Sequence, residues 1–266
     1  MTEGDHHTRQ ERTAWFFRPV ILFATAYIII IVIHESTHAV FAYALNVPFT
    51  LYPFGVDLAR DQGSLTDRAV IGVTGPLCAL LVGLICWFLY RRAKGSRQKL
   101  VLLYLLTFGV ATFFGNLISA AVVGNFVGDF GRAALALRLS MPARYAASLL
   151  GLLSLCALMF AAGWELRRLS PAGSSRLPAI VGMIVLPALA GTAIVILASL
   201  PVPSELVLGR LAEVLFWISG AVGILMSRSA PSGDRRTLHL SWADALALVG
   251  AVIVLRIMAV GISYQQ

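Results

Sequence analysis

Charged residues are scarce in this chain, and their scarcity is the first guide to its class. Asp, Glu, Lys and Arg make up only 13% of the 266 residues, whereas hydrophobic residues make up 58% and the mean hydropathy is +0.82. A soluble domain carries about twice that charged fraction. The composition therefore excludes an ordinary soluble domain and predicts an all-α polytopic membrane protein.

Cysteine is scarce as well. The three cysteines, Cys78, Cys86 and Cys156, lie in apolar segments, so we expect small buried side chains. Their spacing suits neither a disulfide framework nor a Cys-type zinc site. A cleavable signal peptide is not evident, because residues 1–16 form a polar tail and the apolar run after it is too long for a signal sequence.

Acidic residues are fewer than basic ones, which leaves a net charge of +8. In so apolar a chain we expect these arginines to meet anionic lipid at helix ends, and we expect no nucleic-acid partner. Most of the 21 Lys and Arg fall in segments that share a side with the N-terminus. The positive-inside rule then predicts a cytoplasmic N-terminus and an external C-terminus.

Apolar runs divide the chain into membrane spans of about 20 residues each. We expect six to seven transmembrane helices, read as 17–45, 70–91, 99–125, 145–166, 178–200, 206–227 and 241–262. The region 46–69 differs, because Pro and Gly interrupt aromatic and β-branched residues there. It predicts either a short hairpin beside the membrane or an irregular loop, and the sequence leaves both open.

The first span contains the motif His34-Glu35-Ser36-Thr37-His38. Residues four apart lie on one face of a helix, so His34 and His38 can hold one metal ion together, with Glu35 beside them as a general base. Ionisable groups at membrane depth are costly unless they are paired or used. The motif therefore predicts a site for one Zn²⁺ ion inside the bilayer.

Asp129 is the candidate third zinc ligand. His34 lies about 25 Å along the first helix, toward its exit face, and the third span ends on that same face. Asp129 follows the third span, so it should lie at a depth similar to that of the two histidines. An ordinary loop aspartate, or an ion pair with Arg132, is the alternative.

Two asparagines are candidate substrate-binding residues. Asn116 lies in the middle of the third span and Asn125 follows near its end. The Asn116 amide could bind a substrate backbone or support the site, and it could equally bond a neighbouring helix.

With these residues in place, the chain resembles the site-2 protease family of intramembrane zinc metalloproteases. The resemblance rests on the HExxH motif, on Thr74-Gly75-Pro76-Leu77, which is similar to that family's Gly-Pro segment, and on Asp129 in the place of its aspartate ligand. It covers about residues 17–135. The segment around Asp129 departs from the family's pattern, because it has neither the proline nor the Leu-Asp-Gly found there.

The resemblance implies hydrolysis of a peptide bond of a membrane-protein substrate, within or near the bilayer. It implies a metalloprotease-like core at 17–135, a transmembrane-helix substrate and zinc as cofactor, with further helices of unknown role at 136–266. The alternatives are a non-proteolytic member of the same fold that binds metal or client helices, and a metal- or proton-coupled transporter. The expected location is a bacterial plasma membrane.

Overall fold

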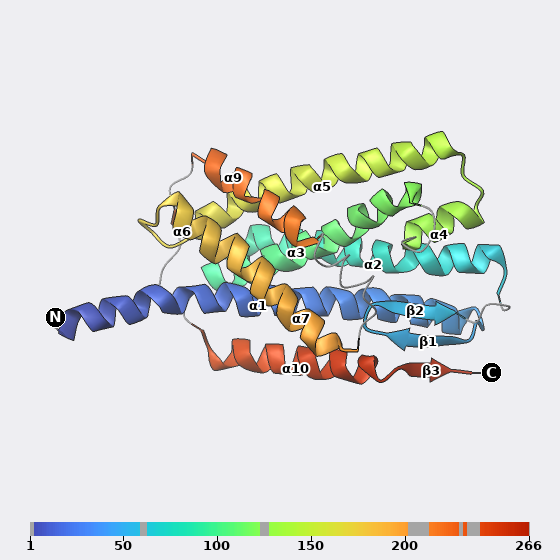
Figure 1. Cartoon of the computed structure of the whole chain (residues 1–266), viewed down its shortest axis with the longest axis horizontal. Helices are drawn as coiled ribbons and strands as arrows, with labels where there is room; N and C mark the ends of the chain where they lie inside the picture. Colours follow the sequence, from blue (N-terminus) through green and yellow to red (C-terminus); the bar gives the residue numbers. More distant parts are fainter. Residues whose placement is uncertain are drawn as a thin grey trace.

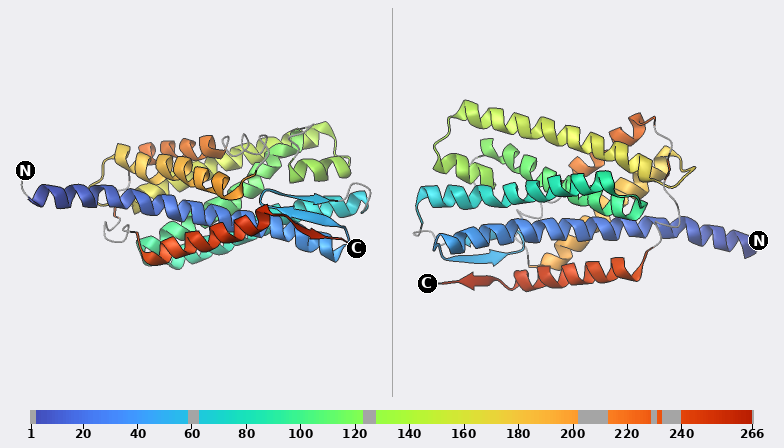
Figure 2. Two further views of the ribbon diagram at one scale, coloured as in Figure 1. Left: turned by 60° about the horizontal axis from the view of Figure 1, so that its bottom comes forward. Right: turned by 180° about the vertical axis from the view of Figure 1, so that it is seen from behind.

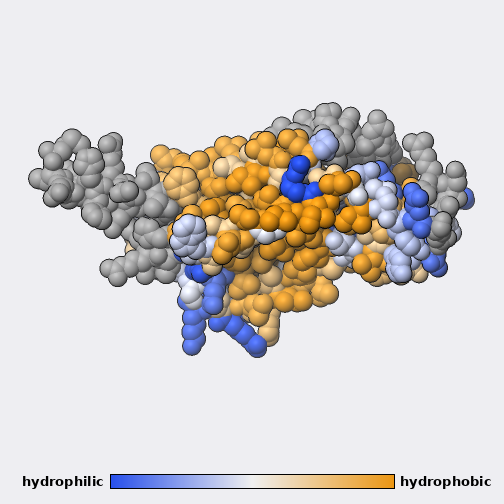
Figure 3. All heavy atoms as spheres, turned by 90° about the horizontal axis from the view of Figure 1, so that it is seen from below, coloured by the Kyte–Doolittle hydropathy of each residue, from blue (hydrophilic) through white to orange (hydrophobic). Residues whose placement is uncertain are grey.

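The computed structural model describes residues 3–58, 63–122, 128–201, 213–228, 231–232 and 240–265, with side chains from residue 16 onward. Within these residues, six helices are long and apolar enough to cross a membrane, so the protein is an all-α polytopic membrane protein. Figure 3 shows apolar side chains as a broad band between polar residues near the two ends. The spans are Phe16–Ala44, Leu65–Arg92, Ser96–Ala121, Met141–Leu169, Arg176–Ser199 and Trp242–Ala259.

Figure 1 shows the elements as a bundle of long helices with a small sheet at one end. In chain order they are α1 (Glu3–Ala44), β1 (Phe49–Tyr52), β2 (Gly55–Leu58), α2 (Leu65–Arg92), α3 (Ser96–Ile118), η1 (Ser119–Ala121), α4 (Asp129–Ala136), α5 (Met141–Leu169), α6 (Arg176–Ile180), η2 (Val181–Val185), η3 (Pro187–Gly191), α7 (Thr192–Ser199), α9 (Ala221–Met226), α10 (Trp242–Ala259) and β3 (Ile262–Tyr264). The polar tail expected at 1–16 is helical from Glu3, where α1 begins.

Different elements lie at the two ends of the bundle. The N-terminus lies at one end, whereas the sheet, α4 and the C-terminus lie at the other (Figures 1 and 2). The expected span over 206–227 is described in part. An apolar helix occupies Glu213–Met226, and its second half is α9.

The sheet has the order β2-β1-β3, with both pairs antiparallel. The hairpin reading of 46–69 is therefore correct. Strand β3 was not expected, because the last apolar span was read to continue to residue 262. Instead α10 ends at Ala259, and Gly261, at φ +87°, turns the chain so that Ser263 pairs with Thr50.

Small residues and aromatic rings hold the bundle together. A Cβ on Gly109 of α3 would lie 2.5 Å from the Ala79 carbonyl of α2, so these helices pack with their backbones close. Phe23 of α1 meets Phe108 edge to face at 4.7 Å between centroids. The bundle core lies around these rings, next to the site described below.

An ion-pair network closes the end of the bundle at which α10 begins. Asp244 of α10 accepts from Arg18 of α1 and from Arg97 of α3, each at 2.7 Å, and it also caps its own helix at Ser241. Arg18 and Asp244 are almost fully buried. Three helices are therefore joined through one carboxylate.

The cysteine expectation is only partly correct. Cys86 is buried and Cys78 is half-buried, but Cys156 is exposed on the outer side of α5. A thiol is a small apolar group, so it can face lipid in a transmembrane helix at little cost.

Candidate metal centre

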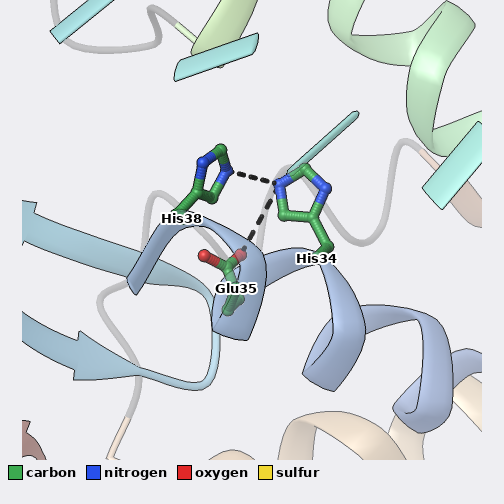
Figure 4. A group of neighbouring side chains, drawn as sticks. All are labelled: His34, Glu35 and His38. Atoms are coloured by element: carbon green, nitrogen blue, oxygen red, sulfur yellow. Dashed lines mark hydrogen bonds and ion pairs between the residues drawn. The ribbon is translucent and has the colours of Figure 1, made fainter. Parts of the chain in front are cut away.

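The HExxH motif lies on α1 with its three ionisable side chains turned to one another (Figure 4). His34, Glu35 and His38 are 7%, 6% and 3% exposed, so all three are buried within the bundle. The two Nε2 atoms of the histidines lie 3.0 Å apart, as the helical spacing of four predicts. Together the three side chains form a cluster able to hold a metal ion.

The ring of His38 is oriented by helix α2. Its Nδ1 lies 2.6 Å from the carbonyl oxygen of Ile71. A carbonyl can only accept, so Nδ1 carries the proton, and in a neutral imidazole Nε2 then has a free lone pair. Metal-binding histidines are commonly held in this way, with the second nitrogen donating to a carbonyl.

Helix α2 approaches this ring so closely that only glycine fits at the contact. A Cβ on Gly75 would lie 2.3 Å from Nε2 of His38, and one on Gly72 would lie 3.1 Å from the carbonyl oxygen of Asp129. Gly75, whose segment Thr74-Gly75-Pro76 was noted only for its family resemblance, therefore packs directly against a candidate ligand.

Asp129 meets the two histidines, as the depth argument predicts. It begins the short helix α4, and its Oδ2 lies 3.0 Å from Nε2 of His34 and 3.4 Å from Nε2 of His38. Burial alone would raise the pKa of the Asp129 carboxyl, yet its contacts with the two imidazoles hold that pKa well below its usual range. The carboxyl is therefore ionised, which is the form that binds metal.

Helix α3 places Asp129 through Asn116. The Asn116 Oδ1 accepts from the backbone N–H of Asp129 at 3.2 Å, while its Nδ2 donates to the Thr112 carbonyl at 2.9 Å. Gly128 makes the approach possible, because a Cβ there would lie 2.6 Å from Oγ of Ser119. Asn116 is therefore bonded to the neighbouring helix α4 at the candidate ligand Asp129, which agrees both with bonding to a neighbouring helix and with support of the site.

The three candidate ligand atoms fit a zinc ion. They form a triangle with sides of 3.0, 3.0 and 3.4 Å. Tetrahedral ligands at zinc distances lie about 3.3 Å from one another. If Nε2 of His34 carries a proton, it can donate a good hydrogen bond to only one of the other two atoms. A metal cation, in contrast, can accept a lone pair from all three atoms at once. Oε1 of Glu35 lies 4.0 Å from Nε2 of His34, outside the triangle, as suits a base.

The site opens into a cavity of about 930 Å³. Strand β2 lines it from Gly55 to Leu58, so the hairpin and the candidate ligands face the same cavity. A cavity of this volume can hold several residues of a peptide as well as water.

Sequence reasoning missed two residues that line the same cavity. Tyr27 lies seven residues before His34 on α1, and its hydroxyl donates to Oε2 of Glu213. The sequence holds no signal for this contact, because the two residues are 186 positions apart. Asn125, the other candidate for substrate binding, lies outside the described residues.

No family model, curated protein or solved structure matches the chain. What the protein does must therefore be argued from the chemistry of these residues.

Proposed function

We propose that the protein is an intramembrane zinc metalloprotease, which hydrolyses peptide bonds of membrane-protein substrates within or near the bilayer. One observation carries the proposal. Two histidine nitrogens and a carboxylate oxygen meet in a zinc-sized triangle inside a membrane bundle, with a glutamate 4.0 Å from one of those nitrogens. Three protein ligands with one open position are typical of catalytic zinc.

The residues have distinct parts in this proposal. His34, His38 and Asp129 would hold the zinc, which when bound polarises a scissile carbonyl and lowers the pKa of water. Glu35 accepts the proton of the attacking water and returns it to the leaving amine. Asn116 keeps the Asp129 backbone in place, and the Ile71 carbonyl keeps the His38 ring turned to the site.

The sheet offers a place for an extended substrate. A transmembrane helix hides its peptide bonds, so a substrate must unwind before it is cleaved. Strand β1 is paired on both sides, whereas β2 ends the sheet and lines the cavity. We therefore assign the outer edge of β2 to substrate, which would pair there by strand addition.

We further propose the substrate class, the catalytic segment and the membrane in which the enzyme acts. The substrate is a protein with a transmembrane helix, the core of the enzyme is the segment 17–135, and the membrane is a bacterial plasma membrane. Six spans with a bundle-embedded HExxH site support an enzyme that meets its substrate in lipid.

The substitution Glu35→Gln tests the proposal, because it removes the base and keeps the size of the side chain. In detergent, the purified wild type should cleave at least one of a set of fluorescently labelled transmembrane-helix peptides, and the variant should lose at least about 100-fold in rate. Zinc content should be equal in both, because Glu35 is not a ligand.

Two outcomes would contradict the proposal. Equal cleavage by the wild type and the Glu35→Gln variant would trace the activity to another group or to a contaminant. Zinc bound by both proteins without any cleavage would favour a metal-binding member of the same fold.

A further inference from the structure

A second pocket, of about 440 Å³, shares no lining residue with the cavity of the metal centre. Helix α2 starts at the end of the bundle with the sheet, so its last turn, which lines this pocket, lies at the other end (Figure 1). Helix α5 also ends at the pocket, and α3 begins there. Three membrane spans therefore meet around a space that is large enough for a small ligand or a lipid headgroup.

Three cations and one carboxylate line this pocket. Arg91 lies in the last turn of α2, Lys99 in the first turn of α3 and Arg168 in the last turn of α5. The carboxylate is that of Glu165, which accepts from the Tyr90 hydroxyl and from the Arg168 guanidinium, each at 2.8 Å. Three positive charges against one negative charge leave the pocket with an excess of two positive charges, so it suits an anion.

Arg91 and Lys99 lie over aromatic rings. The guanidinium of Arg91 is 5.5 Å from the centre of the Trp87 ring, and the amine of Lys99 is 5.9 Å from that of Tyr90. Among the residues that the structure describes, neither cation forms an ion pair. Contact with a ring face attracts the charge but accepts none of the usual hydrogen bonds, so both groups can still donate to an anion.

The surface beside the pocket is that of a helix in contact with lipid. Trp87 and Phe88, one turn before the end of α2, are 48% and 50% exposed. Leu84 and Ile85, a turn further into the span, are exposed as well. Tryptophan and tyrosine are enriched at the level of the lipid headgroups. An anion held by the cations could therefore continue into acyl chains that lie along α2.

The chemistry of the donors favours a phosphate. A phosphodiester has two anionic oxygens, which match the paired N–H groups of an arginine and the point charge of a lysine. The pocket lies on the side of the membrane that the positive-inside rule assigns to the cytoplasm. Basic pockets between membrane helices on that side are known to bind anionic lipid headgroups.

We propose that this pocket binds the phosphate of an anionic phospholipid, with Arg91, Lys99 and Arg168 as its cationic contacts. The bound lipid joins α2, α3 and α5 where these spans meet. This inference does not depend on the proposed function, because no residue of the metal centre lines the pocket.

Native mass spectrometry of the detergent-purified full chain tests the site. The protein is titrated with phosphatidylglycerol, which is anionic, or with phosphatidylcholine, which has the same phosphate but no net charge. We expect one phosphatidylglycerol molecule to bind at least about tenfold more tightly than phosphatidylcholine.

Arg91→Gln and Lys99→Gln should each weaken phosphatidylglycerol binding about tenfold. Arg92→Gln and Lys94→Gln are the matched controls, because each removes the same charge near the same helix end but outside the pocket. Arg92 also lies over a ring, that of Phe88 at 3.8 Å. Both controls should bind phosphatidylglycerol as the wild type does.

Thermal unfolding in detergent separates a lipid from a free anion. Phosphatidylglycerol should raise the melting temperature of the wild type, because a ligand that binds only the folded state stabilises it, and inorganic phosphate should not. Equal stabilisation by inorganic phosphate would overturn the lipid assignment. Equal affinity for the two lipids, or equal losses in the pocket variants and their controls, would trace binding to the general charge of this end and overturn the site.

Discussion

The substitution Gly75→Ala tests whether helix α2 shapes the metal centre. A Cβ at this position would lie 2.3 Å from Nε2, 2.6 Å from Cε1 and 2.9 Å from Cδ2 of His38. Ordinary contact begins at 3.4 Å, so the ring or the helix must move by about 1 Å. The ring has little room to yield, because His38 is 3% exposed and hydrogen-bonded to Ile71.

Such a shift is large on the scale of a metal site. Ligand distances hold to within about 0.2 Å, so a displaced His38 Nε2 no longer meets the ion with the other two atoms. We expect the zinc affinity of Gly75→Ala to fall by at least about 10- to 100-fold, as happens when the partners that orient a ligand are lost.

Gly115→Ala is the matched control. Gly115 lies within helix α3 and lines the cavity, but a Cβ there meets nothing within 4 Å. Both variants gain up to about 1 kcal/mol of helix propensity, so only the clash with His38 separates them. The assay is competition for zinc with a chromophoric chelator, alongside thermal unfolding in detergent. Equal zinc affinity in the two variants would refute the close packing of α2 on His38.

Contacts elsewhere in the structure predict the effects of four further changes. Asn116→Ala should lower zinc affinity about tenfold in the same chelator competition, because the backbone N–H of Asp129 loses its acceptor. Unchanged zinc affinity with weaker peptide binding would instead make Asn116 a substrate-binding residue. Measured by denaturant titration in detergent, Asp244→Ala should lower the free energy of unfolding by about 3–5 kcal/mol, because it leaves Arg18 buried without its carboxylate. Arg97→Ala should cost less in the same denaturation assay, because that side chain is 44% exposed. Removal of residues 262–266 should lower the melting temperature, because β3 pairs with β1. Zinc content should stay the same, because β3 does not line the cavity, and loss of zinc would contradict this prediction.

The sequence predicted those parts of the site that depend on short-range geometry. A spacing of four puts His34 and His38 on one face of any helix, and span lengths alone place Asp129 at their depth. The apolar composition likewise predicts the bundle, because backbone groups in lipid must be satisfied within helices.

Other parts depend on contacts between distant segments, which no local pattern records. Glu213 meets Tyr27 across 186 positions. Helix α2 contacts His38 at Gly75, but in the sequence a glycine within a membrane helix predicts close helix packing as readily as contact with a site residue. Strand β3 was hidden because Ile262 continues an apolar run. Only its pairing with Leu51 of the hairpin shows that the chain is extended there.

The central claim is that His34, His38 and Asp129 bind one zinc ion, and metal content measures it directly. The measurement is zinc per protein molecule, by mass spectrometry of detergent-purified protein, for the wild type, the His34→Ala/His38→Ala double variant and Asp129→Ala. We expect about one zinc in the wild type, none in the double variant and a sharply reduced amount in Asp129→Ala. A well-folded wild type without zinc would contradict the metal centre, and full zinc content in Asp129→Ala would remove Asp129 from it.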